Sequence, residues 1–421
     1  MTNHRWTRRQ LLQTVPGLGL SFLVPGLGLK AAQKRGPERP KSLITVWLGG
    51  GASQLETWDP HPGGKIGGQV KAIKTTLPGL EVADLYPRTA EQIHHLSVIR
   101  SLVSPEGDHE RGTYFVKTGY RATPTAHHPA LGAIITKELP DASIEIPQHI
   151  SLGGGNWPSE GGFLGDDLDA FKIPDPGKTL QNLKAAVPED RQDRQDRRLK
   201  NLAAVTKSFR RGRSRRVDET LHQLTIERSL TIMASDQLRA FEIDKVPQTL
   251  RDEYGDSTFG RGCLVARQLV ELGVRAVEVM LPGWDCHANN HSGHVTQSKL
   301  LDPGLSTLIR DLKQRDLLES TVVLCIGEFG RTPKINPVGG RDHWPHGFSC
   351  LVGGGGLRSG LVIGETDPTG KSKKPTLPMR VQDLFATIMK TMGVDFEKEV
   401  VTPIGRPIQL TEGGTPIEML L

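Results

Sequence analysis

Residues 261–330 read RGCLVARQLVELGVRAVEVMLPGWDCHANNHSGHVTQSKLLDPGLSTLIRDLKQRDLLESTVVLCIGEFG. Apolar residues recur at helical spacing between Val265 and Leu272, and Gly273 follows as a candidate C-cap. The next run, residues 274–281, is apolar and β-branched, which is typical of a buried strand. This stretch therefore begins with a helix that leads directly into a strand.

The second half of the stretch repeats the same pattern. Asp302-Pro303 predicts an N-cap followed by a first-turn proline, and residues 321–326 form another apolar strand. Between them lies the core-facing stripe of a helix, made of Leu305, Leu308, Ile309 and Leu312. Helix, strand, helix and strand in this order predict a parallel sheet with right-handed crossovers. Residues 43–48 and 96–102 are further strand candidates.

The chain has 421 residues, enough for one large α/β domain or for a domain with an insertion. We expect a charged helical insertion at about 184–243, because Asp, Arg and Lys alternate densely in its first part. A solvated helix face explains this composition, and contact with an anion or polymer is the alternative. The formal charge is +6, of which +4 lies before Gln33, so a nearly neutral remainder argues against a nucleic-acid partner.

The N-terminus predicts an export signal. Residues 7–13 read TRRQLLQ, a twin-arginine signature, and an apolar run at 15–29 leads to the small residues Ala31 and Ala32. We therefore expect a twin-arginine signal peptide at 1–32, passage through the twin-arginine export machinery, and a periplasmic or extracellular domain at 33–421. The prolines and glycines of the apolar run argue against a stable membrane span. An attached amphipathic helix is the alternative.

Polar and glycine-rich loops follow three of the predicted strands. They begin after Leu48, Leu281 and Ile326. Ligands of open α/β sheets bind outside the carboxyl ends of the strands, so we expect these loops to converge on one edge. A fourth polar cluster, residues 340–346, follows closely enough to fold back over the same edge.

These loops contain the side chains that bind divalent ions. Carboxylates and imidazoles are ligands for zinc, manganese or calcium, and the predicted metal ligands are Asp285, His287, Glu328, Asp342 and His343. Such an ion polarises an ester oxygen and lowers the pKa of water. Ser53, Arg331 and Arg341 are the candidates for binding the anionic group, since guanidinium offers a bidentate fork. The alternative is that the histidines are hydrogen-bonded loop residues that stabilise turns.

A second cluster reads Asp108-His109-Glu110-Arg111. Its charged side chains are costly to bury, and His109 suits a nucleophile, a base or a ligand. We assign catalytic roles to His109 and Arg111, in contact with the reacting group. A capping loop at a helix start is the alternative.

These motifs resemble the Domain of Unknown Function 1501 family of exported bacterial proteins, over nearly the whole mature chain. The resemblance rests on an ordered series of motifs, which comprises residues 49–54 with 58–60, 107–109 with 118–120, 254–255, 264–273, 284–290, 327–333 and 340–344. The family is grouped with the alkaline phosphatase and sulfatase-like superfamily. That grouping implies a three-layer α/β/α sandwich with a mainly parallel central sheet.

The chain departs from the pattern of that superfamily in three places. Gly49 or Gly50 stands where a metal-binding aspartate is expected, and His109 stands where the resemblance implies a Ser, Thr or Cys nucleophile. A later Asp-His or Asp-Asn pair is replaced by Glu328-Phe329. The departures disfavour a two-metal phosphatase or a formylglycine sulfatase, and they favour one ion held by Asp285, His287 and His343.

The sequence thus favours an exported, metal-dependent hydrolase of phosphate or sulfate esters, with an anionic ester of an extracellular glycan as substrate. The alternative is a non-catalytic exported protein for binding or assembly that retains the fold. Fold alone does not decide between the two. Measurements of bound metal and of ester turnover distinguish the hydrolase from the non-catalytic protein.

Overall fold

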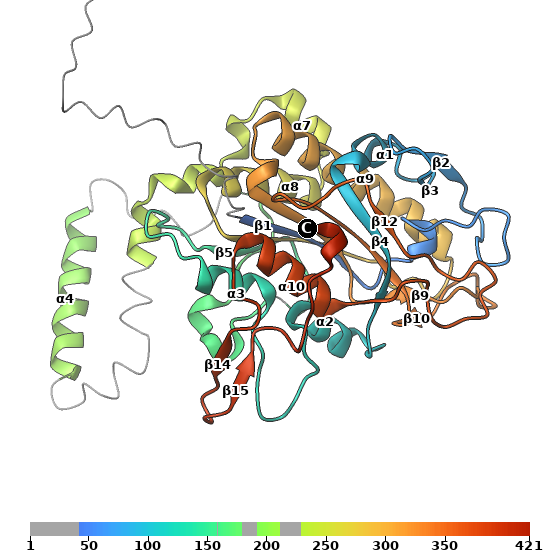
Figure 1. Ribbon diagram of the computed structural model, residues 1–421. Coiled ribbons are helices and arrows are strands. Elements are labelled where there is room, and N and C mark those ends of the chain that lie inside the picture. The colour runs from blue at the N-terminus through green and yellow to red at the C-terminus, as the bar shows by residue number, and fades with distance from the viewer. Residues whose placement is uncertain (1–41, 158, 179–191, 211–228) are drawn as a thin grey trace, which may run out of the picture. The chain divides into compact units, whose positions relative to one another are not determined.

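The computed structural model describes residues 42–157, 159–178, 192–210 and 229–421 (Figure 1). The predicted signal peptide at 1–32 lies outside the described residues, as do parts of the predicted insertion. Among the described residues, no helix is both long and apolar enough to cross a membrane.

A nine-stranded sheet forms the centre of the described part of the chain, in the order β12-β4-β11-β8-β1-β7-β5-β6 with β13 paired to β4. The strands are β1 (Ser42–Gly49), β4 (Leu96–Val103), β5 (His149–Leu152), β6 (Phe171–Ile173), β7 (Ala276–Pro282), β8 (Thr321–Ile326), β11 (Phe348–Gly354), β12 (Val362–Ile363) and β13 (Met379–Arg380). All run in one direction except β11, which is antiparallel to β4 and β8. The prediction of a mainly parallel sheet is confirmed.

Helices cover both faces of this sheet (Figure 1). One face carries α1 (Pro87–Gln92), α7 (Gln248–Tyr254), α8 (Thr258–Leu272) and α9 (Asn290–Gln314), and the other carries α2 (His109–Thr118), α3 (Leu131–Glu138) and α10 (Val381–Met392). Strand β1 is buried on both sides. Ile44 and Val46 pack in the core on the α8 and α9 face, and Leu43 and Trp47 pack in the core on the α2 and α10 face. The predicted three-layer α/β/α sandwich is confirmed.

The predicted start of α9 at Asp302-Pro303 is wrong. The helix begins twelve residues earlier, at Asn290, and Pro303 lies inside it. The carboxylate of Asp302 does cap a helix, but that helix is α1, whose first-turn amides of Arg88 and Thr89 donate to it at 3.0 and 2.7 Å. The predicted apolar stripe from Leu305 to Leu312 is fully buried, as expected.

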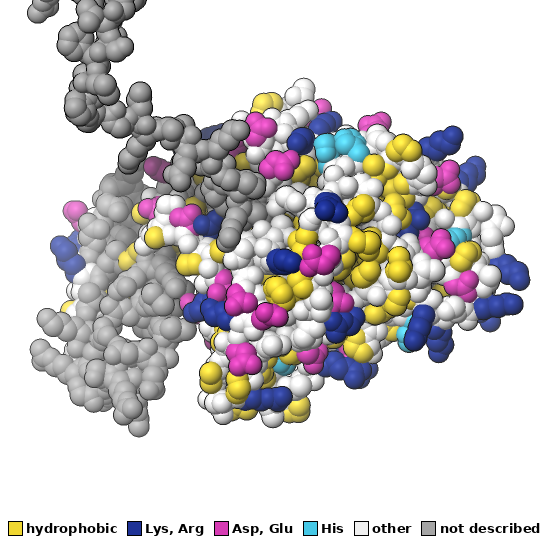
Figure 2. All heavy atoms as spheres, viewed as in Figure 1, with side chains coloured by type: hydrophobic (Ala, Val, Ile, Leu, Met, Phe, Trp, Pro, Cys, Tyr) yellow, Lys and Arg dark blue, Asp and Glu magenta, His cyan; other side chains and the backbone are white. Residues whose placement is uncertain are grey.

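Smaller elements complete the described chain. Three two-stranded pairs are β2 (Ala72–Lys74) with β3 (Glu81–Ala83), β9 (Gly330–Arg331) with β10 (His343–Trp344), and β14 (Glu399–Val401) with β15 (Pro407–Gln409). The charged segment forms α4 (Gln192–Arg210) within the predicted insertion. Charges of both signs are interspersed over the face drawn in Figure 2.

Candidate metal centre

The centre lies where β1, β7 and β8 end side by side. Strands β7 and β8 flank β1 in parallel, so the loops that follow all three leave the same edge of the sheet. Asp285 follows β7, and Glu328 follows β8. The β9–β10 pair then brings His343 back to this edge, because His343 lies opposite Arg331 in its register. Residues 340–346 therefore fold over the edge as the sequence predicts.

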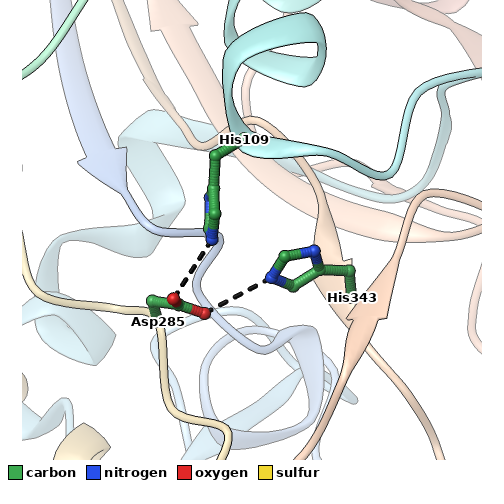
Figure 3. Close-up of side chains that lie close together, drawn as sticks. All are labelled: His109, Asp285 and His343. Atoms are coloured by element: carbon green, nitrogen blue, oxygen red, sulfur yellow. Dashed lines mark hydrogen bonds and ion pairs between the residues drawn. The ribbon is translucent and has the colours of Figure 1, made fainter.

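Helix α2 contributes His109. Asp108 is its N-cap, and the Asp108 Oδ1 accepts a hydrogen bond from the amide of Arg111 at 3.2 Å. This cap fixes the first helical residue, His109, at the centre. Ligand atoms of His109, Asp285 and His343 lie within 4.8 Å of one another (Figure 3).

Three imidazoles point at one carboxylate. The Nε2 atom of His109 lies 3.2 Å from Asp285 Oδ2, while the Nε2 atoms of His287 and His343 lie 3.1 and 3.4 Å from Asp285 Oδ1. The two Nε2 atoms of His287 and His343 are 3.0 Å apart. Four side chains from three separate parts of the chain thus converge on one point.

The other nitrogen of each ring has its own partner. The Nδ1 atoms of His109, His287 and His343 lie 2.8, 2.9 and 2.8 Å from Glu328 Oε1, Asp342 Oδ1 and the carbonyl oxygen of Gly107. Carboxylates and carbonyls only accept hydrogen bonds, so each Nδ1 must carry the proton. In the neutral rings every Nε2 then presents a lone pair to Asp285. This is the arrangement of metal-binding histidines, whose orientation a carboxylate or carbonyl fixes from behind.

The arrangement leaves an excess of acceptors at the centre. Three Nε2 lone pairs and a carboxylate face one another at 3.0–3.4 Å, and such atoms repel unless a proton or a cation lies between them. Imidazole nitrogens with a carboxylate oxygen form a donor set typical of zinc. The residues therefore fit a divalent ion held by His109, Asp285 and His343, whose ligand atoms all lie within 4.8 Å of one another. His287, with its Nε2 3.1 Å from Asp285 Oδ1, stays a predicted further ligand.

Charges around the centre keep Asp285 ionised. Partial burial raises the pKa of Asp285, but the hydrogen bond and the charge of Arg331, at 2.7 Å, outweigh it and lower the pKa to about 2. The hydrogen bond that His109 donates to Glu328 raises the pKa of His109, while burial lowers the pKa of His343.

Two of the predicted metal ligands, Glu328 and Asp342, contact the histidine rings of the centre. Glu328 is buried, and its Oε1 accepts hydrogen bonds from His109 and from the amide of Gly50 at 2.8 Å. Asp342 holds His287 in the same way. In the structure both carboxylates orient a histidine ring, and Glu328 Oε2 is buried without a hydrogen-bond partner among the described residues, so their role as direct ligands stays a prediction. The sequence suggested a ligand role for His109, and the structure places its Nε2 in the donor cluster.

The three residues predicted to bind an anion do not face the centre as free groups. Arg341 is fully buried and paired with Glu56 at 2.9 Å, and Arg331 is fully buried with carbonyl acceptors and Asp285 around it. Ser53 is buried as the N-cap of a short 3-10 helix. All three have scaffold contacts in the structure, and their role in binding an anion stays a prediction. Arg111, by contrast, has an exposed side chain on the first turn of α2.

The departures from the superfamily pattern have structural reasons. Gly50 has φ 111°, and a Cβ there would lie 2.5 Å from the amide nitrogen of Asp285, so a side chain has no room. Phe329 is buried, and its ring packs 4.4 Å from the ring of His343 and 5.1 Å from that of His109. It forms an apolar wall for the centre and supplies no ligand.

Several solved structures are similar to this chain. Among solved structures, the PsFucS1 sulfatase from Pseudoalteromonas sp. is similar with TM-score 0.37 and 14% identity, over 85% of this chain and 68% of that one. An alkaline phosphatase from the Antarctic bacterium TAB5 has TM-score 0.38 and 13% identity, over 85% and 99%. The lipoteichoic acid synthase LtaP from Listeria monocytogenes has TM-score 0.39 and 9% identity, over 88% and 74%.

No curated protein matches the sequence. The family model described as "Protein of unknown function (DUF1501)" matches residues 40–421, which include every residue of the centre. The chain therefore belongs to the DUF1501 family, as its motifs indicate.

Proposed function

We propose that the protein is an exported hydrolase of phosphate or sulfate esters that uses a single divalent metal ion. One observation carries the proposal, namely that the Nε2 atoms of His109, His287 and His343 converge on Asp285 while each Nδ1 is held from behind. When bound, a divalent ion polarises an ester oxygen and lowers the pKa of a water molecule.

The residues around the proposed ion have different roles. His109, Asp285, His287 and His343 would hold the ion, and Glu328 and Asp342 keep two of the rings in the tautomer that binds metal. Arg111 has a 66% exposed side chain beside Glu106 and Asp108, and among the four residues predicted to contact the anionic group it is the one with an exposed guanidinium. Phe329 excludes water from one side of the centre.

A non-catalytic binding protein is the second candidate. The burial of Arg331 and Arg341 favours it, because an ester hydrolase needs charge near the transferred group and both guanidinium groups serve the scaffold instead. This candidate shares the metal centre and lacks turnover. Bound metal, which the sequence offered as one criterion, therefore no longer separates the two candidates, and ester turnover does.

Export by the twin-arginine pathway is part of the proposal. The TRRQLLQ signature and the apolar run that follows support it. Fusion of residues 1–32 to a reporter that is active only outside the cytoplasm tests it, with Arg8→Lys/Arg9→Lys as the variant. Loss of export in the variant is expected. Equal export of both fusions would contradict the twin-arginine assignment.

Turnover of aryl phosphate and aryl sulfate tests the function. We expect the metal-loaded wild type to hydrolyse at least one of them, and His343→Ala to lose the activity. His346→Ala is a matched control, because His346 is an exposed histidine three residues away in the same loop. Metal-loaded protein without turnover of either ester would favour the binding protein.

A further inference from the structure

An exposed tryptophan, Trp157, has no role in the site described above. Trp157 is 42% exposed, whereas Trp47, Trp58 and Trp284 are each at most 2% exposed. It also has φ 51°, a left-handed conformation that costs about 1–2 kcal/mol in a non-glycine residue. An exposed aromatic residue held in such a conformation indicates a functional position.

A buried ion pair fixes the backbone of Trp157. The Nζ atom of Lys117 donates to the carbonyl oxygen of Trp157 at 2.8 Å and lies 2.8 Å from Glu278 Oε2. Both charged side chains are at most 6% exposed. Ser159 donates to the same carboxylate at 2.8 Å. The loop is therefore anchored on both sides of position 158, by residues of α2 and β7.

Trp157 lines a pocket of about 200 Å³ along the side of α2. Glu110, Tyr114 and Lys117 come from the helix, and His127 and Glu160 lie across from them. His127 is stacked on the ring of Tyr114 and lies 3.2 Å from a Glu160 oxygen. The volume is below the range of roughly 300–1,000 Å³ for drug-sized ligands, so it suits one ring.

The pocket and the metal centre share helix α2. Glu110 directly follows the proposed ligand His109 in the first turn of α2. The Trp157 loop follows β5, which pairs in parallel with β7 at Leu152 and Val279. The loop that carries Trp157 and the loop that carries Asp285 therefore leave the same edge of the sheet.

We propose that this pocket binds a neutral sugar ring of the substrate, with Trp157 as its stacking platform. An aromatic face packs against the apolar face of a sugar ring, and carboxylates and imidazoles accept and donate the hydrogen bonds of its hydroxyl groups. Glu110 and Glu160 repel an anionic ring, so the ester group lies outside the pocket, toward the centre. The placement of the ester group at the metal centre rests on the proposed function. Binding of the sugar ring in the pocket does not depend on that function.

The test is binding of neutral sugars to the full mature chain after metal removal with a chelator. The probes are four neutral tetrasaccharides, of glucose, mannose, xylose and galactose, observed by saturation-transfer NMR and titrated by calorimetry. We expect at least one to bind. Trp157→Ala should weaken this binding about tenfold, equivalent to about 1.4 kcal/mol, and Trp157→Phe should restore most of it. Phe171→Ala is a matched control, since Phe171 is 40% exposed and lies outside the pocket lining.

The outcomes separate the two proposals. Sugar binding that depends on Trp157, without ester turnover by metal-loaded protein, supports the pocket and contradicts the hydrolase. Ester turnover with no binding of any of the four sugars overturns the pocket and leaves the hydrolase standing. Sugar binding that Trp157→Ala does not change overturns the pocket too. A third result would also overturn the pocket proposal. In it, none of the sugars binds, but the cationic probe spermidine binds and Glu160→Gln abolishes that binding.

Discussion

Asp285 contacts each of the three imidazoles, and Arg331 and the pair Glu328–His109 hold the arrangement in place. At this scale the sequence predicted the residues better than their roles. Residue type and position after a strand pointed to Asp285 and His287, and the polar cluster at 340–346 supplied His343. The structure brings the three together, and metal binding by them stays a prediction. Which carboxylates bind and which orient depends on side-chain geometry within a few ångströms, and no spacing in the sequence encodes that difference between Asp285 and Glu328.

Glu328→Gln tests the orienting role. Gln retains an acceptor for His109 and for the Gly50 amide but loses the charge that raises the pKa of His109. We expect the affinity for zinc, measured by chelator competition, to fall about 10–100-fold. The exposed Glu365→Gln is the control. An unchanged affinity in Glu328→Gln would show that the carboxylate has only a scaffold role.

Gly50→Ala tests the close approach of the β1 and β7 loops. The new Cβ would lie 2.5 Å from Asp285 N and 2.9 Å from Trp284 N, at φ 111°. We expect the free energy of unfolding in urea to fall by roughly 3 kcal/mol. Gly63→Ala is the control, because Gly63 also has a positive φ, 72°, but open space around it, so about 1 kcal/mol is expected there. Equal losses in the two variants would contradict the packing argument.

At the scale of elements, the sequence predicted four strands of the central sheet and two helices of one outer layer, because buried strands and amphipathic helices have strong periodicity. It misplaced the start of α9, because Asp302 followed by Pro303 is the local pattern of a helix start. The side chain caps α1 instead, and a tertiary contact between residues more than 200 positions apart is invisible in the local pattern.

Asp302→Ala should therefore destabilise the protein through α1. The variant leaves the first-turn amides of Arg88 and Thr89 without their acceptor, at a cost of about 1–2 kcal/mol in the free energy of unfolding. Asp302→Asn keeps an acceptor, so a smaller loss is expected. Hydrogen exchange should localise the effect to residues 87–92. Faster exchange confined to the α9 amides near Asp302 would contradict the assignment of the cap to α1.

At the scale of the whole molecule, buried neutral histidines make the fold sensitive to acid. Burial lowers the pKa of His128 to about 4 and also lowers the pKa of His149 and His294. The unfolded chain then binds more protons than the folded one between pH 6.5 and about 4. The free energy of unfolding should be greatest above this window and fall as the pH decreases through it.

Urea denaturation at pH 7 and at pH 5 measures this effect. Wild type should lose stability at the lower pH, and His128→Gln should lose less, because it removes the group with the pKa of about 4. A pH dependence that is identical in wild type and His128→Gln would show that His128 makes no contribution.

The central claim concerns the whole site, a mononuclear centre assembled at one sheet edge from α2 and from the loops after β7 and β8. X-ray absorption spectroscopy of the zinc-loaded protein tests it most directly, compared with His343→Ala and His346→Ala. We expect imidazole scattering from several rings at about 2.0–2.1 Å, reduced in His343→Ala and unchanged in His346→Ala. Zinc surrounded only by oxygen atoms, or a spectrum unchanged in His343→Ala, would contradict the account.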